Sequence, residues 1–182
     1  MERRVALKNL LVIAGGTILL PSCLHQDQKV SIPLNHIKVS GEQEALLGEM
    51  VETIIPKTDT SGAKELGVHQ FVLVMIDDCT KEEDQQKFIK GLDEVNSLAQ
   101  KQFNNSFIKC KPGEREQLLQ RMEKKEFGED VTSFYERLKK LTIQGYLKSQ
   151  YVMTNLLKYE LVPGRFHGSH PVTAKTVFVQ NG

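Results

Sequence analysis

The sequence predicts an all-α protein: a single-domain bundle of five or six helices with a non-helical C-terminal tail. Apolar residues recur every three or four positions along most of the chain, which is the spacing of one helix face. Capping residues and prolines stand where these segments begin and end. The alternation typical of a strand is confined to residues 173–180, too short and isolated for a sheet.

The first helix is predicted to begin after Ser40, because Ser40 and Gln43 have the spacing of a capping box. Its apolar stripe consists of Leu46, Leu47, Met50, Val51, Ile54 and Ile55. Pro56 ends the helix, since proline has no amide hydrogen and disfavours helical geometry in the residue before it. A loop over residues 57–62 is expected to follow.

A second helix is expected from about Val68 to Asp78, although its β-branched residues leave a buried strand as an alternative. Thr80 and Glu83 repeat the capping-box spacing and predict the start of a third helix. The apolar stripe of that helix consists of Phe88, Leu92, Val95 and Leu98.

Pro112 predicts the start of a fourth helix, because its ring is preformed for a first turn, and Glu114 and Glu116 suit the positive helix end. Its apolar face consists of Leu118, Leu119 and Met122. The fifth helix has the clearest spacing, carried by Val131, Phe134, Leu138, Leu141 and Gly145. It either continues through Ser149 or breaks there, with a sixth segment reaching Tyr159.

The first 22 residues have the features of an export signal. Arg3 and Arg4 precede an uncharged run, residues 10–20, that is shorter than the roughly 20 residues a membrane-spanning helix needs. The paired arginines resemble a twin-arginine signal, which exports folded proteins, with ordinary secretion as the alternative. Residues 20–23 resemble a lipoprotein processing box. Cys23 is then the lipidated first residue of a periplasmic, membrane-anchored chain, unless cleavage occurs elsewhere.

The predicted organisation is a signal over residues 1–22, a polar tether over residues 23–39 and a helical domain over residues 40–182. From Cys23 onward the chain is long enough to bury one self-sufficient core. Its net charge of +1 gives no indication of nucleic-acid binding.

The sequence predicts no catalytic, cofactor-binding or metal site in this chain. It has no glycine-rich dinucleotide loop, phosphate-binding loop, nucleophile elbow or haem attachment motif. His167 and His170 are three residues apart but have no evident third ligand. Cys79 and Cys110 either form a disulfide, which would stabilise the fold by about 3 kcal/mol, or remain free thiols.

Three polar and glycine-containing blocks, residues 53–67, 134–149 and 159–168, stand where a plain bundle does not need them. In this order they resemble the small subunit, subunit 3 or gamma, of membrane-bound gluconate 2-dehydrogenase and related flavin dehydrogenases. The matching residues are Thr53, Ile54, Ile55, Pro56, Thr58, Asp59, Gly62, Ala63 and Gly67, then Leu138, Leu141, Thr142, Gly145 and Tyr146, then Pro163, Gly164, Arg165, Phe166 and Gly168.

The resemblance implies a helical accessory subunit that performs no chemistry itself. In this family a large partner of the glucose-methanol-choline type holds FAD and oxidises a sugar or sugar acid, often with a cytochrome c subunit as electron acceptor. The small subunit binds the flavoprotein and supports its folded export. A folded-export signal on a chain without a cofactor motif agrees with this role. The alternative is a stand-alone, lipid-anchored helical module that binds a ligand or protein.

Partner contacts are expected in the second and third blocks. Pro163 and Gly164 predict a turn that presents Arg165, whose planar guanidinium suits a carboxylate or backbone carbonyls. Tyr146 and Tyr159 have the rigid amphipathic rings common at interfaces.

Some of the matching residues are expected to serve the chain's own structure instead. Asp59 has the character of a residue that caps a turn, and Gly145 permits close helix packing. For these two positions we favour the internal role over partner contact.

Overall fold

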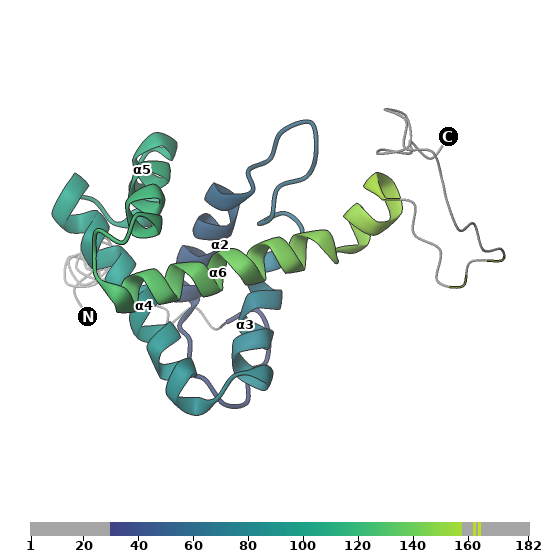
Figure 1. Ribbon diagram of the computed structural model, residues 1–182, viewed down its shortest axis with the longest axis horizontal. Coiled ribbons are helices and arrows are strands. Elements are labelled where there is room, and N and C mark those ends of the chain that lie inside the picture. Colours follow the sequence, from purple (N-terminus) through teal and green to yellow (C-terminus); the bar gives the residue numbers. More distant parts are fainter. Residues whose placement is uncertain (1–29, 158–161, 163, 165–182) are drawn as a thin grey trace, which may run out of the picture.

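The computed structural model describes residues 30–157, 162 and 164. In this part of the chain five α-helices pack around one core and no strand is present (Figure 1). The elements are α2 (Gly41–Ile54), α3 (Val68–Cys79), α4 (Glu82–Phe103), the 3-10 turn η1 (Phe107–Lys109), α5 (Pro112–Glu123), α6 (Glu129–Leu147) and the π-helical turn η2 (Val152–Leu156). The predicted all-α bundle is confirmed. No helix within these ranges is long and apolar enough to cross a membrane.

Helix α2 begins as the sequence predicts. The Ser40 hydroxyl accepts a hydrogen bond from the Gln43 amide (3.1 Å), and the Gln43 side chain accepts one from the Ser40 amide (2.9 Å). This reciprocal pair satisfies two amides that the helix itself leaves without partners. The helix ends at Ile54, where the Ile55 amide still donates to Val51 and Pro56 follows. The capping box and the proline stop are both confirmed.

The segment before residue 80 is a helix, so the strand alternative for it is wrong. The capping box predicted at Thr80 for the start of the next helix is also wrong, because α4 begins at Glu82 and the Thr80 hydroxyl has another partner. The Thr80 hydroxyl donates to the Met75 carbonyl (3.0 Å), and Gln85 of α4 donates to the Ile76 carbonyl (3.1 Å). The end of α3 thus uses side chains that the sequence assigned to the start of α4.

Helix α5 has Pro112 in its first turn, as predicted, and α6 ends at Leu147. The Ser149 amide and hydroxyl both donate to the Tyr146 carbonyl, which closes the helix at the predicted break. The following segment is the single π turn η2. Its expected extension to Tyr159 lies outside the described residues.

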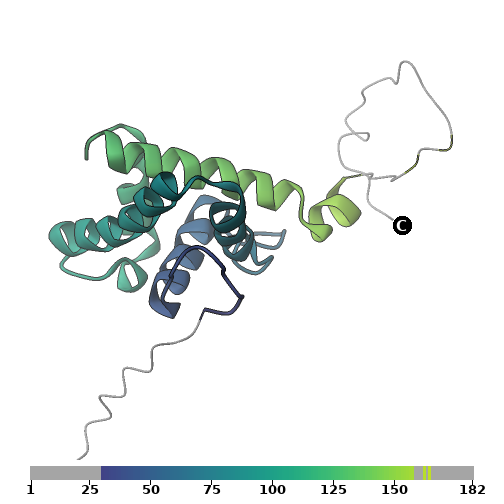
Figure 2. The same ribbon diagram turned by 90° about the horizontal axis from the view of Figure 1, so that it is seen from below.

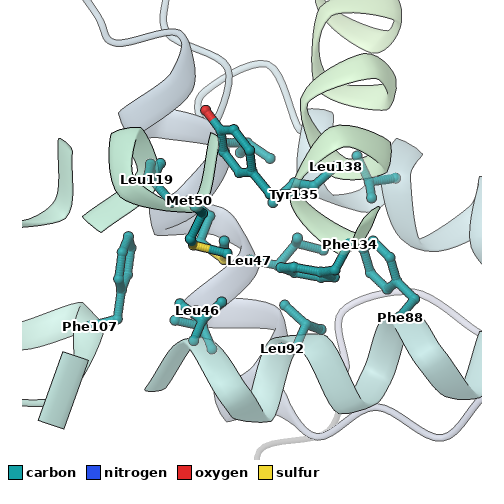
Figure 3. Close-up of a cluster of buried hydrophobic side chains, with 14 of the residues drawn as sticks. Leu46, Leu47, Met50, Phe88, Leu92, Phe107, Leu119, Phe134, Tyr135 and Leu138 are labelled. Atoms are coloured by element: carbon teal, nitrogen blue, oxygen red, sulfur yellow. The ribbon is translucent and has the colours of Figure 1, made fainter. Parts of the chain in front are cut away.

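Helix α6 lies across the bundle and contacts each of the other four α-helices (Figures 1 and 2). In the core, the rings of Phe88 and Phe134 meet at a tilt with centroids 5.0 Å apart (Figure 3). Gly91 permits the approach of Phe134, and Gly145 permits a separate close contact between α6 and α3. A β-carbon at Gly91 would lie 2.5 Å from Phe134, and one at Gly145 would lie 2.6 Å from Phe71. The predicted packing role of Gly145 is confirmed.

Residues 30–39, which we call the strap, lie against the helices. Ile37 is only 5 % exposed, and four further apolar side chains of the strap pack half-buried against the core: Val30, Ile32, Leu34 and Val39. The prediction of a polar tether over residues 23–39 is therefore corrected for residues 30–39. The sequence hid this contact because apolar and exposed polar residues alternate in the strap without a helical period. Residues 23–29 lie outside the described part.

Candidate partner-binding surface

The outer face of α6 changes character along its length. Ser133, Glu136 and Lys140 occupy its first half and are exposed polar residues. Ile143 and Leu147 continue the same face at helical spacing, and they are 41 % and 50 % exposed. Single exposed apolar residues are ordinary, but two on successive turns of one face form a patch that favours protein contact.

The apolar character continues beyond the helix. Leu157 and Val162 are 41 % and 82 % exposed. Figure 1 shows the end of α6 and η2 extending past α2 and α3, at the side of the molecule farthest from α5. We call Ile143, Leu147 and Leu157 the apolar end. Val162 is the most exposed large apolar side chain among the described residues.

The loop between α2 and α3 is attached to this end of α6 by Tyr146. The Tyr146 hydroxyl donates to the Ser61 carbonyl (3.1 Å) and lies 3.4 Å from the Thr60 hydroxyl. Its ring is half-buried against the core. The structure thus gives Tyr146 an internal role that links the first and second sequence blocks, while partner contact by Tyr146 stays a prediction.

The carboxylate of Glu52 organises that loop from within. One oxygen accepts the Lys57 amide and the other accepts the Lys64 amide, each at 2.9 Å. The loop closes so tightly that a β-carbon at Gly62 would lie 2.5 Å from the Glu52 carboxylate. Sequence reasoning missed Glu52. The available signal was an acidic residue near the C-terminal end of a helix, where the helix dipole disfavours negative charge.

Asp59 does not have the turn-capping role that the sequence predicted. Thr58 has that role instead: its amide donates to the Thr60 carbonyl (3.0 Å), and its hydroxyl accepts the Thr60 amide (3.5 Å). A threonine hydroxyl closes such a turn in the same way as an aspartate carboxylate. Residue type alone therefore could not show whether Thr58 or Asp59 caps the turn. Asp59 itself is exposed at the tip of the loop.

Replacing Glu52 with alanine is expected to loosen the loop, because two charge-assisted hydrogen bonds to its backbone are lost. We expect a loss of about 1–2 kcal/mol in unfolding free energy and faster hydrogen exchange at the Lys57 and Lys64 amides. Glu65→Ala is the matched control, since Glu65 makes only an exposed ion pair with Lys57. Equal exchange in the two variants would contradict the organising role of Glu52.

The base of the loop is tied to the bundle through Glu49. Its carboxylate accepts hydrogen bonds from Lys64 of the loop and from Arg115 of α5. Burial raises the pKa of Glu49, but the Lys64 hydrogen bond and the positive charges of Arg115 and Lys64 outweigh this and lower it. Glu49 is therefore held ionised at the point where α2, α5 and the loop meet.

Cys79 and Cys110 are free thiols in the structure, so the disulfide alternative is not realised. Cys79 is exposed at the end of α3, whereas Cys110 is buried after η1. Burial, together with the nearby charge of Glu114, raises the pKa of the Cys110 thiol and keeps it protonated.

Several predicted site residues lie outside the described residues and are not placed. They are Arg3, Arg4, Cys23, Tyr159, Pro163, Arg165, His167 and His170. Gly164, the one described member of the predicted turn, is exposed.

The described surface has several hollows. The hollow between α4 and α6, about 420 Å³, is lined by Phe88, Phe134 and charged side chains. Two of those charges, Arg137 and Asp84, pair with each other at 3.4 Å. Within the described ranges, no three His, Cys, Asp or Glu side chains are grouped so that they could hold a metal ion.

The fold defines a small all-α protein with exposed apolar residues on the last turns of α6. A family model, Gluconate 2-dehydrogenase subunit 3, matches residues 41–164, from the first residue of α2 to the end of the described chain. The protein belongs to this family, which confirms the resemblance drawn from the three sequence blocks. No curated protein and no solved structure matches the chain.

Proposed function

We propose that the protein is a non-catalytic accessory subunit of an exported, FAD-dependent dehydrogenase complex. It binds the flavin-containing large subunit, of the glucose-methanol-choline type, and supports its folded export and assembly. The large subunit oxidises a sugar or sugar acid and passes electrons to a cytochrome c subunit. Membership of a family named for a dehydrogenase subunit carries this proposal, and the apolar end of α6 supports it.

The α6 part of the apolar end is suited to hold a partner because its backbone is fixed before binding. Gly145 lies against Phe71 of α3, and Tyr146 is bonded to the loop, so this part of α6 is held from two sides. Ile143 and Leu147 lie on either side of these contacts along the helix. A rigid surface loses little conformational entropy on association, and burying such side chains contributes roughly 1 kcal/mol or more each.

The N-terminal sequence supports the export part of the proposal. A twin-arginine-like pair, Arg3 and Arg4, precedes a chain without a recognisable cofactor motif. The folded passenger is then the cofactor-bearing partner. Lipidation of Cys23 would hold the complex at the periplasmic side of a membrane.

The test is co-purification of the tagged chain with the flavoprotein from cells that express both. Ile143→Asp with Leu147→Asp is expected to reduce flavoprotein recovery at least roughly tenfold, because two carboxylates would enter an apolar contact. Both residues are already exposed, so the melting temperature of the variant should stay near that of the native chain.

A matched control changes the polar half of the same face. Ser133→Asp with Lys140→Gln alters net charge by the same amount and should leave recovery unchanged. Equal loss in both variants would assign the effect to charge and not to the apolar end. A colourless native chain that purifies without a flavoprotein would contradict the proposed function and favour the stand-alone binding module.

A further inference from the structure

The strap is bound to the bundle mainly through carboxylates. Asp77, in the last turn of α3, accepts the backbone amides of Asn35, His36 and Ile37, each at 2.7 Å. Three successive amides that converge on one anion form a concave anion-binding site. The position of Asp77 at the negative end of a helix dipole is otherwise unfavourable, so the strap supplies the compensating positive field.

A second carboxylate holds the other end of the strap. Glu44, in the first turns of α2, accepts hydrogen bonds from both the amide and the hydroxyl of Ser31. The Ser31 hydroxyl also accepts a hydrogen bond from Gln70 (2.9 Å), and His69 Nε2 lies 3.8 Å from Glu44. Ile37, the last residue of the first attachment, has a buried side chain.

The strap is separable from the bundle. The family match begins at Gly41, directly after the strap and the capping residue Ser40. The side chains with no exposure at all, such as Leu47, Met50 and Leu92, all lie outside the strap. Release of the strap therefore uncovers the apolar side chains of the bundle that it packs against, but leaves the centre of the core in place.

We propose that the strap is a releasable latch that sets how far the helical body can lie from the N-terminal anchor. When the strap is bound, only residues 24–29 separate Cys23 from the body, and their full extension spans about 25 Å. When it is released, the connection runs to Gly41 and its full extension reaches about 60 Å. The membrane-distance part of this inference rests on the proposed anchoring at Cys23.

The first measurement tests the latch alone, by hydrogen exchange and by tryptic cleavage at Lys38 in the mature full-length chain. Asp77→Asn with Glu44→Gln is expected to speed exchange at amides 35–37 and cleavage at Lys38 roughly tenfold or more, because the anionic acceptors are lost. Asp78→Asn is the control, since Asp78 is an exposed neighbour of Asp77. Retained helical circular dichroism in the variant shows that the bundle is still folded.

The second measurement tests the reach, in the lipidated chain reconstituted into vesicles that carry an acceptor-labelled lipid. A donor dye on the exposed Cys79 reports the distance of the body from the lipid surface, since Cys110 is buried. Energy transfer should be high for the native chain and for Asp78→Asn, and lower by about half or more for the double variant, whose connection is longer.

The outcomes separate the latch from the anchor. Unchanged exchange at amides 35–37 in the double variant would overturn the latch. Faster exchange with unchanged energy transfer, in a chain whose mass shows acyl groups, would overturn the control of reach. A mass without acyl groups would rule out anchoring at Cys23 and the control of membrane distance. The exchange measurement would then still test whether the strap is a latch.

Discussion

Arg115→Ala is expected to lower the unfolding free energy by about 2–4 kcal/mol, the second largest single effect that we predict. Arg115 is 16 % exposed and reaches from α5 to three acceptors, the carboxylate of Glu49 and the carbonyls of Phe107 and Ile108. Removing the guanidinium leaves a partly buried carboxylate and two carbonyls without this donor. Urea unfolding followed by circular dichroism measures the change.

Arg121→Ala is the matched control for this prediction. Arg121 lies on the same helix and pairs with Glu126 through side chains that are 36 % and 40 % exposed. An ion pair of this exposure contributes about 1 kcal/mol or less. A loss for Arg115→Ala no larger than that for Arg121→Ala would show that the contacts of Arg115 do not hold α5 to α2.

The same site determines part of the acid sensitivity. Because the folded-state pKa of Glu49 is lowered, its ionised form stabilises the fold above the ordinary glutamate pKa, and this contribution is lost as the pH falls through the lowered value. In Arg115→Ala one of the two cationic partners is absent. We therefore expect its stability to fall less steeply with acid than that of the native chain.

Phe134→Ala should have the largest effect on stability, a loss of about 3–5 kcal/mol, because it removes a buried ring and leaves a cavity beside Phe88. Helix α4 packs closely against this ring, because Gly91 has no side chain that would collide with it. Thermal and chemical unfolding measure the loss. A change of less than about 1 kcal/mol would mean that the site collapses without cost.

A second substitution makes this prediction sharper. Gly91→Ala alone should destabilise the native chain, since its β-carbon would lie 2.5 Å from Phe134. In the Phe134→Ala background the same change should be stabilising. The methyl group then fills part of the cavity, and alanine favours the helix over glycine by about 1 kcal/mol. The same sign in both backgrounds would show that Gly91 and Phe134 are not coupled.

The features that were predicted correctly depend on neighbours in the sequence. The capping box at Ser40, the proline stop at Pro56 and the proline start at Pro112 each involve residues within one helical turn. The apolar stripe of α6 follows from periodicity alone. Family membership was predicted from three blocks of residues and their order, both of which can be read from the sequence without a structure.

The features that were missed depend on contacts between distant segments. Asp77 and Asn35 are 42 positions apart, and nothing local to either residue indicates their hydrogen bond. Thr80 had the right spacing for a capping box, but its hydroxyl bonds backward to α3. Periodicity also cannot tell which face of a helix its neighbours leave uncovered, so Ile143 and Leu147 did not stand out until α6 was seen to extend past α3.

The position of α6 has a consequence for how the protein is made. It is the last long helix of the described residues, yet α2, α3, α4 and α5 all pack on it. During synthesis the four earlier helices can pack on one another, but the surfaces that α6 covers stay open until residues 129–147 have emerged from the ribosome. The bundle is therefore complete only after α6 has been synthesised and has packed on the four earlier helices.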